Sequence, residues 1–403
     1  MENQAIAIDN GSIYTKMGYV GNSVPDLFIP TAIADIEDIS DNYNYYIGKK
    51  AFNIIKKSKY HKLTYPIKNK VIEDWDLMEK FWNKSLFNYL KADPQEHFFC
   101  LNQSPMTTKQ DRINIAEIFF ETFNVPGIYL GMEAFFSMLA LNHLTKNILL
   151  YKCDDETQKS IESLTGIVVI SGDGATYIVP ICDGFIINSK IKTFPITGNE
   201  ITKFMENKLK ERGEKIDKED LYYAAMELKE KKGYLVKDIN GEYSKFDNKS
   251  SEFKTFKGIG KISGNPYTIN VGYESFLGPE SFFSPKIINK KYKYSLDEII
   301  HQVIQECPIE YRKSLYSNIL LSGGNTLFGH IDDKLQLNLK KGLNERLKKI
   351  DAKPNSIRVN VNRQPEFFLE WLGESCFCTK DSFKDGIHTK EEYLEKGAKC
   401  LNN

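Results

Sequence analysis

Two glycine-bearing turns in the sequence have the composition of a phosphate-binding site. The first runs from Asp9 to Lys16 and the second from Ser171 to Thr176. Backbone N–H groups that converge on one point bind phosphate without adding a charge that must be buried, and glycine lets the chain close around the anion. Lys16 can reach a phosphate oxygen, and the carboxylates of Asp9 and Asp173 suit Mg²⁺ or Ca²⁺ held through water molecules. Each turn alone could be an ordinary hairpin, so the predicted site for a triphosphate and a cation depends on their combination.

A third glycine motif follows the apolar run 318–321, where Gly323 and Gly324 come directly after Ser322. A strand, a glycine pair and a helix let a ligand approach the backbone closely. No P-loop motif and no Gly-x-Gly-x-x-Gly follows a strand, which excludes the common nucleotide-binding fingerprints. The six histidines are scattered, and no serine, histidine and acid constellation stands out.

The elements that must hold the turns follow a repeated pattern. Apolar runs at 5–8 and 15–20 flank the first turn, and runs at 166–170 and 175–180 flank the second, which predicts strand, turn and strand in both places. The repeat indicates a duplicated fold, with two unrelated hairpins as the alternative. The sequence also predicts helices after the N-cap Asp74, over 115–123 and over 132–144, a surface insertion at 147–164, a helical segment at 208–232, and exposed loops with short strands at 241–265.

Composition restricts the class of protein. The chain has 403 residues, of which 41% are hydrophobic and 27% charged, and its formal net charge is zero. These values are typical of a soluble protein of two domains, and they do not favour binding to nucleic acid or to an anionic membrane. Seven scattered cysteines without a Cys-x-x-Cys pair indicate reduced thiols. With no signal-peptide pattern and no apolar run of membrane length, we expect an intracellular protein without membrane insertion.

The turns and their surroundings resemble the actin superfamily, in the same order from about residue 5 to about residue 400. Residues 9–16 are similar to the first phosphate loop of that family, 171–176 to the second, and 322–328 to its adenosine segment. The resemblance implies an α/β fold of two lobes and four subdomains, with duplicated mixed β-sheets around a cleft that binds ATP or ADP with Mg²⁺ or Ca²⁺. The cation would be held through waters by Asp9 and Asp173. The nucleotide-binding residues that the resemblance implies are Asp9, Asn10, Gly11, Ser12, Tyr14, Lys16, Gly172, Asp173, Gly174, Ala175, Thr176, Gly198, Lys229, Glu230, Gly323, Gly324, Asn325, Leu327 and Phe328.

The same resemblance implies the domain organisation. Residues 1–150 and 350–403 are expected to form the first lobe, with 28–63 as a small tip subdomain. Residues 151–349 are expected to form the second lobe, with about 198–282 as its smaller subdomain. The acidic run 35–38 in the tip is interpreted as a solvated loop rather than a filament-contact element.

Further strings indicate one branch of the superfamily. Residues 73–79, 272–280, 307–309 and 388–390 resemble the branch whose members pair with actin-related protein 2 in a seven-subunit complex. That branch implies an ATP-binding structural subunit which, with nucleation-promoting factors, templates branched actin filaments on existing actin filaments, in the cytoplasm and cytoskeleton. Two alternatives stay open. One is a diverged or nuclear actin-related protein in a repurposed or chromatin-associated complex, and the other is a sugar-kinase-like enzyme of the same clan.

Five residues depart from the family pattern. Ile170 replaces an aspartate of the metal–water shell, Tyr177 replaces a histidine that helps to orient the attacking water, and Glu133 replaces a glutamine that positions that water. Because hydrolysis needs a metal-held phosphate and an oriented water, we expect weak or absent ATP hydrolysis, although Glu133 keeps a carboxylate that can accept a proton. Ile13 replaces a glycine where a β-branched residue disfavours positive φ. Glu374 also replaces a glycine, with an expected effect on packing or on a partner surface.

Overall fold

The computed structural model describes residues 4–36, 45–58, 60–147, 155–247, 254–364 and 368–402. Contacts between residues divide the chain into two units. Unit 1 comprises Met1–Val168, Ile181–Ile186 and Glu366–Asn403, and unit 2 comprises Val169–Pro180 and Ile187–Pro365. The expected lobe boundary at 150–151 and residues 37 and 38 of the acidic run lie outside the described residues. The expected lobe and subdomain boundaries therefore stay predictions.

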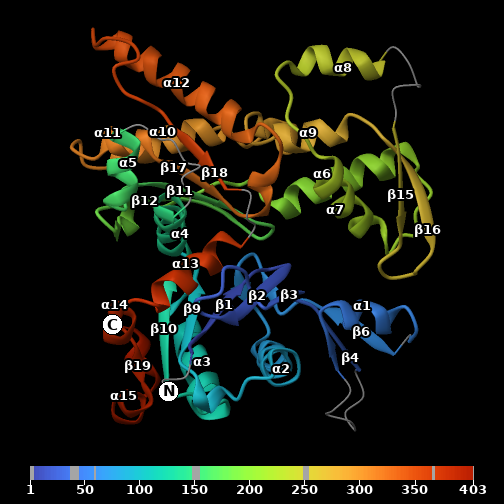
Figure 1. Cartoon of the computed structure of the whole chain (residues 1–403). Helices are drawn as coiled ribbons and strands as arrows, with labels where there is room; N and C mark the ends of the chain where they lie inside the picture. Colours follow the sequence, from blue (N-terminus) through green and yellow to red (C-terminus); the bar gives the residue numbers. More distant parts are fainter. Residues whose placement is uncertain are drawn as a thin grey trace. The chain divides into compact units, whose positions relative to one another are not determined.

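The main sheet of unit 1 holds the first turn. Its strands are β1 (Ile6–Asn10), β2 (Tyr14–Tyr19), β3 (Leu27–Pro30), β9 (Phe99–Gln103), β10 (Gly127–Met132) and β19 (His388–Thr389), in the order β19-β10-β9-β1-β2-β3 (Figure 1). β9 is parallel to both β1 and β10, whereas the other neighbours are antiparallel. The first turn joins β1 to β2 and sets Asp9 opposite Lys16 in the register. The predicted strand, turn and strand are confirmed.

Of the helices that cover this sheet, the first begins where the sequence predicted, whereas the second begins at Lys109 rather than at the expected residue 115. α2 (Trp75–Lys84) starts after Asp74, whose side chain accepts a hydrogen bond from the backbone N–H of Leu77. α3 (Lys109–Glu117) starts with a reciprocal capping box between Thr108 and Asp111. Both helices continue as π-helical turns, η1 (Ser85–Leu90) and η3 (Ile118–Thr122). The predicted third helix is α4 (Glu133–Asn147).

Helix α13 (Leu369–Cys378) lies in the core of unit 1, where it packs against α4 and β1. The indole N–H of the fully buried Trp371 donates to the carbonyl of Ala7 at 3.1 Å. Gly373 allows the close approach of the two helices, because a Cβ atom there would lie 1.8 Å from the carbonyl oxygen of Phe136. Glu374 is fully buried beside it. Of the two effects expected of Glu374, on packing or on a partner surface, its burial supports the effect on packing.

The remaining elements of unit 1 include one correction. α5 (Asp155–Glu162) buries Thr157, Ser160 and Ile161, so this part of the expected surface insertion is a packed helix, whereas 148–154 lie outside the described residues. The other elements are β4 (Ile33–Ile36), β5 (Tyr46–Ile47), β6 (His61–Thr64), β7 (Ile67–Lys68), β8 (Val71–Ile72), α1 (Lys49–Ile55), η2 (Pro94–Glu96), α14 (Asp381–Asp385), α15 (Lys390–Lys396) and η8 (Gly397–Asn402).

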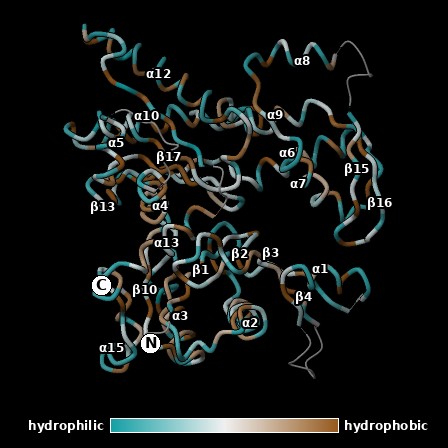
Figure 2. The backbone as a smooth tube through the Cα atoms, viewed as in Figure 1, coloured by the Kyte–Doolittle hydropathy of each residue, from teal (hydrophilic) through white to brown (hydrophobic). Residues whose placement is uncertain are grey.

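The second sheet carries the second turn. Its strands are β11 (Gly166–Ser171), β12 (Thr176–Cys182), β13 (Phe185–Ile186), β14 (Lys192–Thr193), β17 (Ile319–Ser322) and β18 (Val361–Arg363), in the order β13-β12-β11-β17-β18 with β14 on β12. Every residue of β11, β12 and β17 is buried, which agrees with their apolar sequences and with the hydrophobic colouring of β17 in Figure 2. The second predicted strand, turn and strand are also confirmed.

The helices of unit 2 correct two sequence expectations. The helical segment 208–232 is interrupted, since α6 (Gly198–Arg212) ends at Gly213 with φ of 73° and α7 begins only at Leu221. Part of the expected loop region 241–265 is helical, because α8 spans Ile239–Asp247. The remaining elements are α7 (Leu221–Lys232), β15 (Lys254–Ile259), β16 (Pro266–Val271), α9 (Glu274–Glu280), α10 (Leu296–Glu306), α11 (Arg312–Ser317), α12 (Ile331–Lys349), η4 (Asn188–Lys190), η6 (Pro285–Ile287) and η7 (Gly324–Leu327). Over the described ranges, no helix has the length and apolar character to cross a bilayer.

Candidate functional site

The two turns are closed by the same backbone hydrogen bond. The N–H of Gly11 donates to the carbonyl of Tyr14 at 3.0 Å, and the N–H of Gly172 donates to the carbonyl of Ala175 at 3.0 Å. In the described part of the chain, no hydrogen bond engages the backbone N–H groups of the two residues after each glycine, 12–13 and 173–174. Successive free N–H groups in a turn form a concave anion site. Each turn can therefore bind a phosphate group.

The backbone conformation of the first turn shows how Ile13 is accommodated in place of a glycine. Ile13 does not have a positive φ, so the replacement of the glycine by a β-branched residue causes no backbone strain of that kind. Gly11 is required for a different reason, because a Cβ atom there would lie 2.4 Å from the carbonyl oxygen of Tyr14. Tyr14 itself lies on β2, where its ring stacks on Phe28 at 4.8 Å between centroids.

Asp9 and Lys16 form a buried ion pair at the first turn. The Lys16 ammonium lies 2.6 Å from Oδ2 of Asp9, and the side-chain amide of Asn102 donates to Oδ1 at 2.8 Å. Burial alone would raise the pKa of Asp9, but Lys16 and Lys70 outweigh burial and lower it. Burial would likewise lower the pKa of Lys16, but Asp9 outweighs it and raises that pKa. Both groups therefore stay charged at neutral pH.

The first turn is tied to neighbouring elements through its polar side chains. Oδ1 of Asn10 accepts a hydrogen bond from the indole N–H of Trp82 at 3.1 Å, and Oγ of Ser12 accepts one from the backbone N–H of Lys70 at 3.1 Å. These contacts hold the turn against α2 and against the connection between β7 and β8. The sequence prediction named Asn10 and Ser12 but missed Lys70.

Lys70 is the main residue that sequence reasoning missed. Its ammonium lies 2.7 Å from Oε2 of Glu133, at the position where the family resemblance implies a glutamine. Burial raises the pKa of Glu133, and the Lys70 cation opposes that effect. The pKa of Glu133 stays raised overall, so Lys70 reduces the tendency of this carboxylate to accept a proton from water without removing it. The two residues are 63 positions apart, and the only local signal was the polar turn sequence around Asn69.

In unit 2, the second turn, Gly198, Lys229 and Asn325 converge. The Lys229 ammonium donates to the carbonyl of Gly198 at 3.0 Å and lies 3.6 Å from Oδ1 of Asp173. The amide of Asn325 donates to the carbonyl of Gly172 at 2.8 Å. A Cβ atom at Gly198 would lie 2.9 Å from Cα of Asp173 and 3.0 Å from Nζ of Lys229, which explains the glycine. Burial raises the pKa of Asp173 and lowers that of Lys229, so this pair is less strongly ionic than Asp9 and Lys16.

The other predicted residues of unit 2 lie in two groups. The hydroxyl of Thr176 forms a hydrogen bond with Oγ of Ser171 at 2.9 Å and donates to the carbonyl of Ile196 at 2.7 Å. These bonds fix the end of the turn, directly after Gly174 and Ala175. Glu230 is exposed on α7, and its carboxylate interacts electrostatically with Lys229 and Asp173 of this cluster. Gly324, Leu327 and Phe328 follow β17, and only Phe328 of the two apolar side chains is buried. Their role beside the nucleotide stays a prediction.

Gly323 is predicted to tolerate no side chain. Its φ is 92°, and a Cβ atom would lie 2.4 Å from the carbonyl oxygen of Ser171. Gly323→Ala should therefore lower the free energy of unfolding by about 2 kcal/mol, since it combines a strained backbone with a clash. Thermal unfolding followed by circular dichroism measures the change. Gly324→Ala is the matched control, because nothing lies within 4 Å of the added atom, and an equal loss in the control would contradict the explanation.

The oxygen atoms of Asp9 and Asp173 could hold a divalent cation only through bound water molecules. Both oxygens of Asp9 already accept hydrogen bonds, and Ile170 offers a buried alkyl group where an acid would be needed. Oδ1 of Asp173 is buried and, within the described ranges, accepts no hydrogen bond. Those ranges contain no group of three or more His, Cys, Asp or Glu side chains that could hold a metal directly. Asp173 is thus the residue most available to a hydrated Mg²⁺ or Ca²⁺.

Comparisons with known proteins agree with the fold that the sequence predicted. The family model described as Actin matches residues 1–403. The chain is 38% identical to actin-related protein 3 of Oryza sativa subsp. indica over 430 aligned residues, which cover 99% of this chain and 97% of the rice protein. It is 36% identical to actin-related protein 3 of Caenorhabditis elegans, with 98% and 95% covered, and of Acanthamoeba castellanii, with 99% and 96% covered. This chain belongs to the actin family.

Proposed function

We propose that this chain is an ATP-binding structural subunit of an actin-related protein 2/3 complex, where it templates the nucleation of branched actin filaments. The observation that carries the proposal is the similarity to proteins named actin-related protein 3, which extends over 95% to 97% of their length. The similarity therefore covers almost the whole chain and is not limited to the nucleotide-binding residues. The proposed partners are actin-related protein 2, the other complex subunits, actin filaments and nucleation-promoting factors, and the proposed location is the cytoplasmic cytoskeleton.

The proposed ligand is ATP or ADP with Mg²⁺ or Ca²⁺. The free N–H groups of the two turns support phosphate binding, and Lys16 supplies a charged donor beside the first of them. A bound cation would offset the negative charge of the phosphates. In the chain itself, Asp9 orients Lys16, while Asn325 and Gly198 hold the second turn in place.

The same residues support slow or absent ATP hydrolysis. Ile170 and Tyr177 are both buried in the second sheet, at the positions where the family resemblance implies an acid and a histidine. Lys70 is paired with Oε2 of Glu133, which makes this carboxylate a weaker general base than an unpaired one. The proposed role of the nucleotide is therefore to bias the conformation of the subunit rather than to be turned over.

The test combines assembly with nucleotide binding. Affinity purification of the tagged chain from its own cells should recover an actin-related protein 2 homologue and small subunits, and the purified assembly should accelerate polymerisation of pyrene-labelled actin. Calorimetry should detect ATP binding below millimolar concentration, with phosphate release slower than that of conventional actin. Recovery with chromatin proteins alone would instead favour a nuclear actin-related protein.

Lys16→Met should weaken ATP binding at least tenfold, because it removes the cation at the first turn.

A further inference from the structure

Lys70 and Glu133 form an ion pair that the fold maintains at some cost. Their side chains are 13% and 1% exposed, so both charges are largely removed from water. Lys70 lies in the tight connection between β7 and β8 with φ of 64°, and Asn69 before it has φ of 50°. The left-handed region is unfavourable for a lysine. A pair that requires both burial and an unfavourable backbone conformation indicates a specific role for the lysine.

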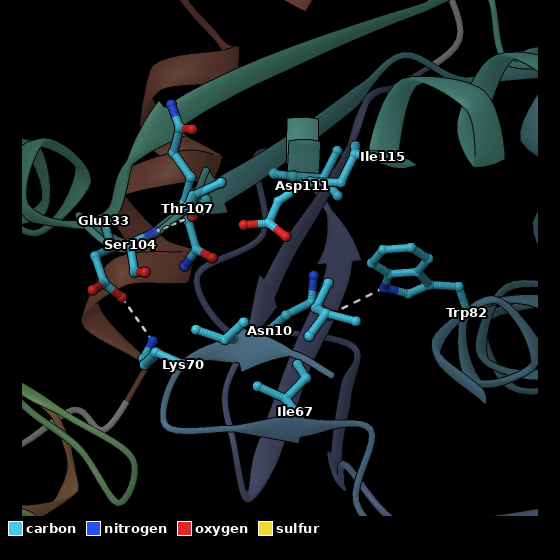
Figure 3. A pocket seen from close by; sticks show the side chains of 14 residues that line it. Asn10, Ile67, Lys70, Trp82, Ser104, Thr107, Asp111, Ile115 and Glu133 are labelled. Carbon is cyan, nitrogen blue, oxygen red and sulfur yellow. Dashed lines mark hydrogen bonds and ion pairs between the residues drawn. The ribbon is translucent and has the colours of Figure 1, made fainter. Parts of the chain in front are cut away.

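The pair is attached to the first phosphate turn. The backbone N–H of Lys70 donates to Oγ of Ser12, which is one of the residues whose own N–H is free for phosphate. Figure 3 shows Lys70 and Glu133 facing each other, with Asn10 nearby, where they line a cavity of about 50 Å³. The Lys70 ammonium is therefore held beside the turn that also contains Asp9 and leads to Lys16.

Charge explains why Glu133 needs this partner. Asp9 is balanced by Lys16, and Glu133 is balanced by Lys70. Burial alone would lower the pKa of Lys70, but Glu133 and Asp9 outweigh burial and raise it, so the cation persists at neutral pH. Without Lys70, the carboxylate of Glu133 would have no compensating cation and would lie beside a turn that binds anions. One like charge at short range in a partly buried site changes affinity by about tenfold to a hundredfold.

We propose that Lys70 is a specificity-determining cation, which cancels the charge of Glu133 and so allows the first turn to accept a nucleoside polyphosphate. The proposal rests on the nucleotide binding proposed above and identifies the residue pair that sets its strength. The effect is larger for ATP than for ADP, because ATP carries one more phosphate group and hence more negative charge.

The experiment is a double-mutant cycle on the full chain in its purified assembly, with dissociation constants for ATP and ADP measured by calorimetry at two salt concentrations. Lys70→Met should weaken ATP binding about tenfold or more, with a smaller loss for ADP. Glu133→Gln should tighten ATP binding, because Lys70 is then free to attract phosphate. The double variant should return to within about threefold of the original affinity. Lys70→Arg, which keeps the charge, should lose less affinity than Lys70→Met.

The opposite signs of the two single variants distinguish charge from structure. A merely structural pair would lose affinity when either partner is removed, and that result would overturn the proposal. Melting temperatures show whether Lys70→Met is folded, and the double variant, which buries no unpaired charge, keeps the cycle informative if that single variant is not. Absence of ATP binding in the original chain would contradict the proposed function itself, whereas binding with single variants that change in the same direction would contradict only this inference.

Discussion

Replacing Gly373 with alanine is expected to lower the free energy of unfolding by about 3 kcal/mol or more. The added Cβ atom would lie 1.8 Å from the carbonyl oxygen of Phe136 and 2.4 Å from its carbonyl carbon. Both are backbone atoms of α4, so no side-chain rotation can relieve the clash. The two helices would have to separate, and buried contacts around Trp371 would be lost. Thermal or urea unfolding measures the effect.

A matched control separates this clash from the general effect of alanine in a helix. Gly342 lies in the middle of α12, is exposed, and has nothing within 4 Å of an added Cβ atom. Gly342→Ala should stabilise the protein by up to about 1 kcal/mol, because alanine has the higher helix propensity. The explanation would fail if both substitutions shifted the midpoint in the same direction.

The second large effect is expected at Glu374, whose carboxyl group is fully buried on α13. In the described part of the chain, neither oxygen has a hydrogen-bond partner. Burial raises the pKa of Glu374 well above its ordinary value, and Asp9, Cys378 and Glu370 add to that shift. Glu374→Met should therefore raise the free energy of unfolding by about 2 kcal/mol at pH 8, since it replaces an unsatisfied polar group with an apolar one.

The pH dependence at this position has a definite sign. Because the pKa of Glu374 is higher in the folded state than in the unfolded state, folding binds a proton above the unfolded pKa of about 4.3. The native protein therefore loses stability as pH rises from that value toward the folded pKa. Glu374→Gln removes the titration, so its advantage over the native protein should grow between pH 5 and pH 8.

Urea titrations at several pH values measure this difference. Glu395→Gln, which replaces an exposed glutamate of α15, is the control and should show no such growth. A constant difference between Glu374→Gln and the native protein across this pH range would mean that Glu374 is already ionised in the folded state.

The features that could be predicted from the sequence are those encoded within a few neighbouring residues. Both glycine turns and the N-cap at Asp74 were predicted, and the structure confirms them, whereas the ion pair between Asp9 and Lys16 was not predicted. Turn geometry and capping depend on local backbone conformation and on one or two side chains. The family resemblance then extended these local features to the whole chain.

The features that could not be predicted depend on contacts between distant segments. Lys70 reaches Glu133 only because the fold brings the connection between β7 and β8 to the first residue of α4, and no local spacing encodes that contact. The sequence did contain a signal for the burial of Glu374, because most residues of α13 are apolar, and eight of its ten residues are in fact buried. The effect of Ile13 could not be predicted, because a missing glycine does not show which φ the loop adopts.

The positions of the tryptophans have a practical consequence for these experiments. The sequence contains three tryptophans, at 75, 82 and 371, and all of them lie in unit 1. Two of the indole N–H groups bond to β1, through Ala7 and Asn10. Tryptophan fluorescence therefore reports on unit 1 alone, with Trp82 as a label-free optical probe next to the first turn. Unit 2 contributes no tryptophan emission, so comparing fluorescence with circular dichroism separates the melting of the two units.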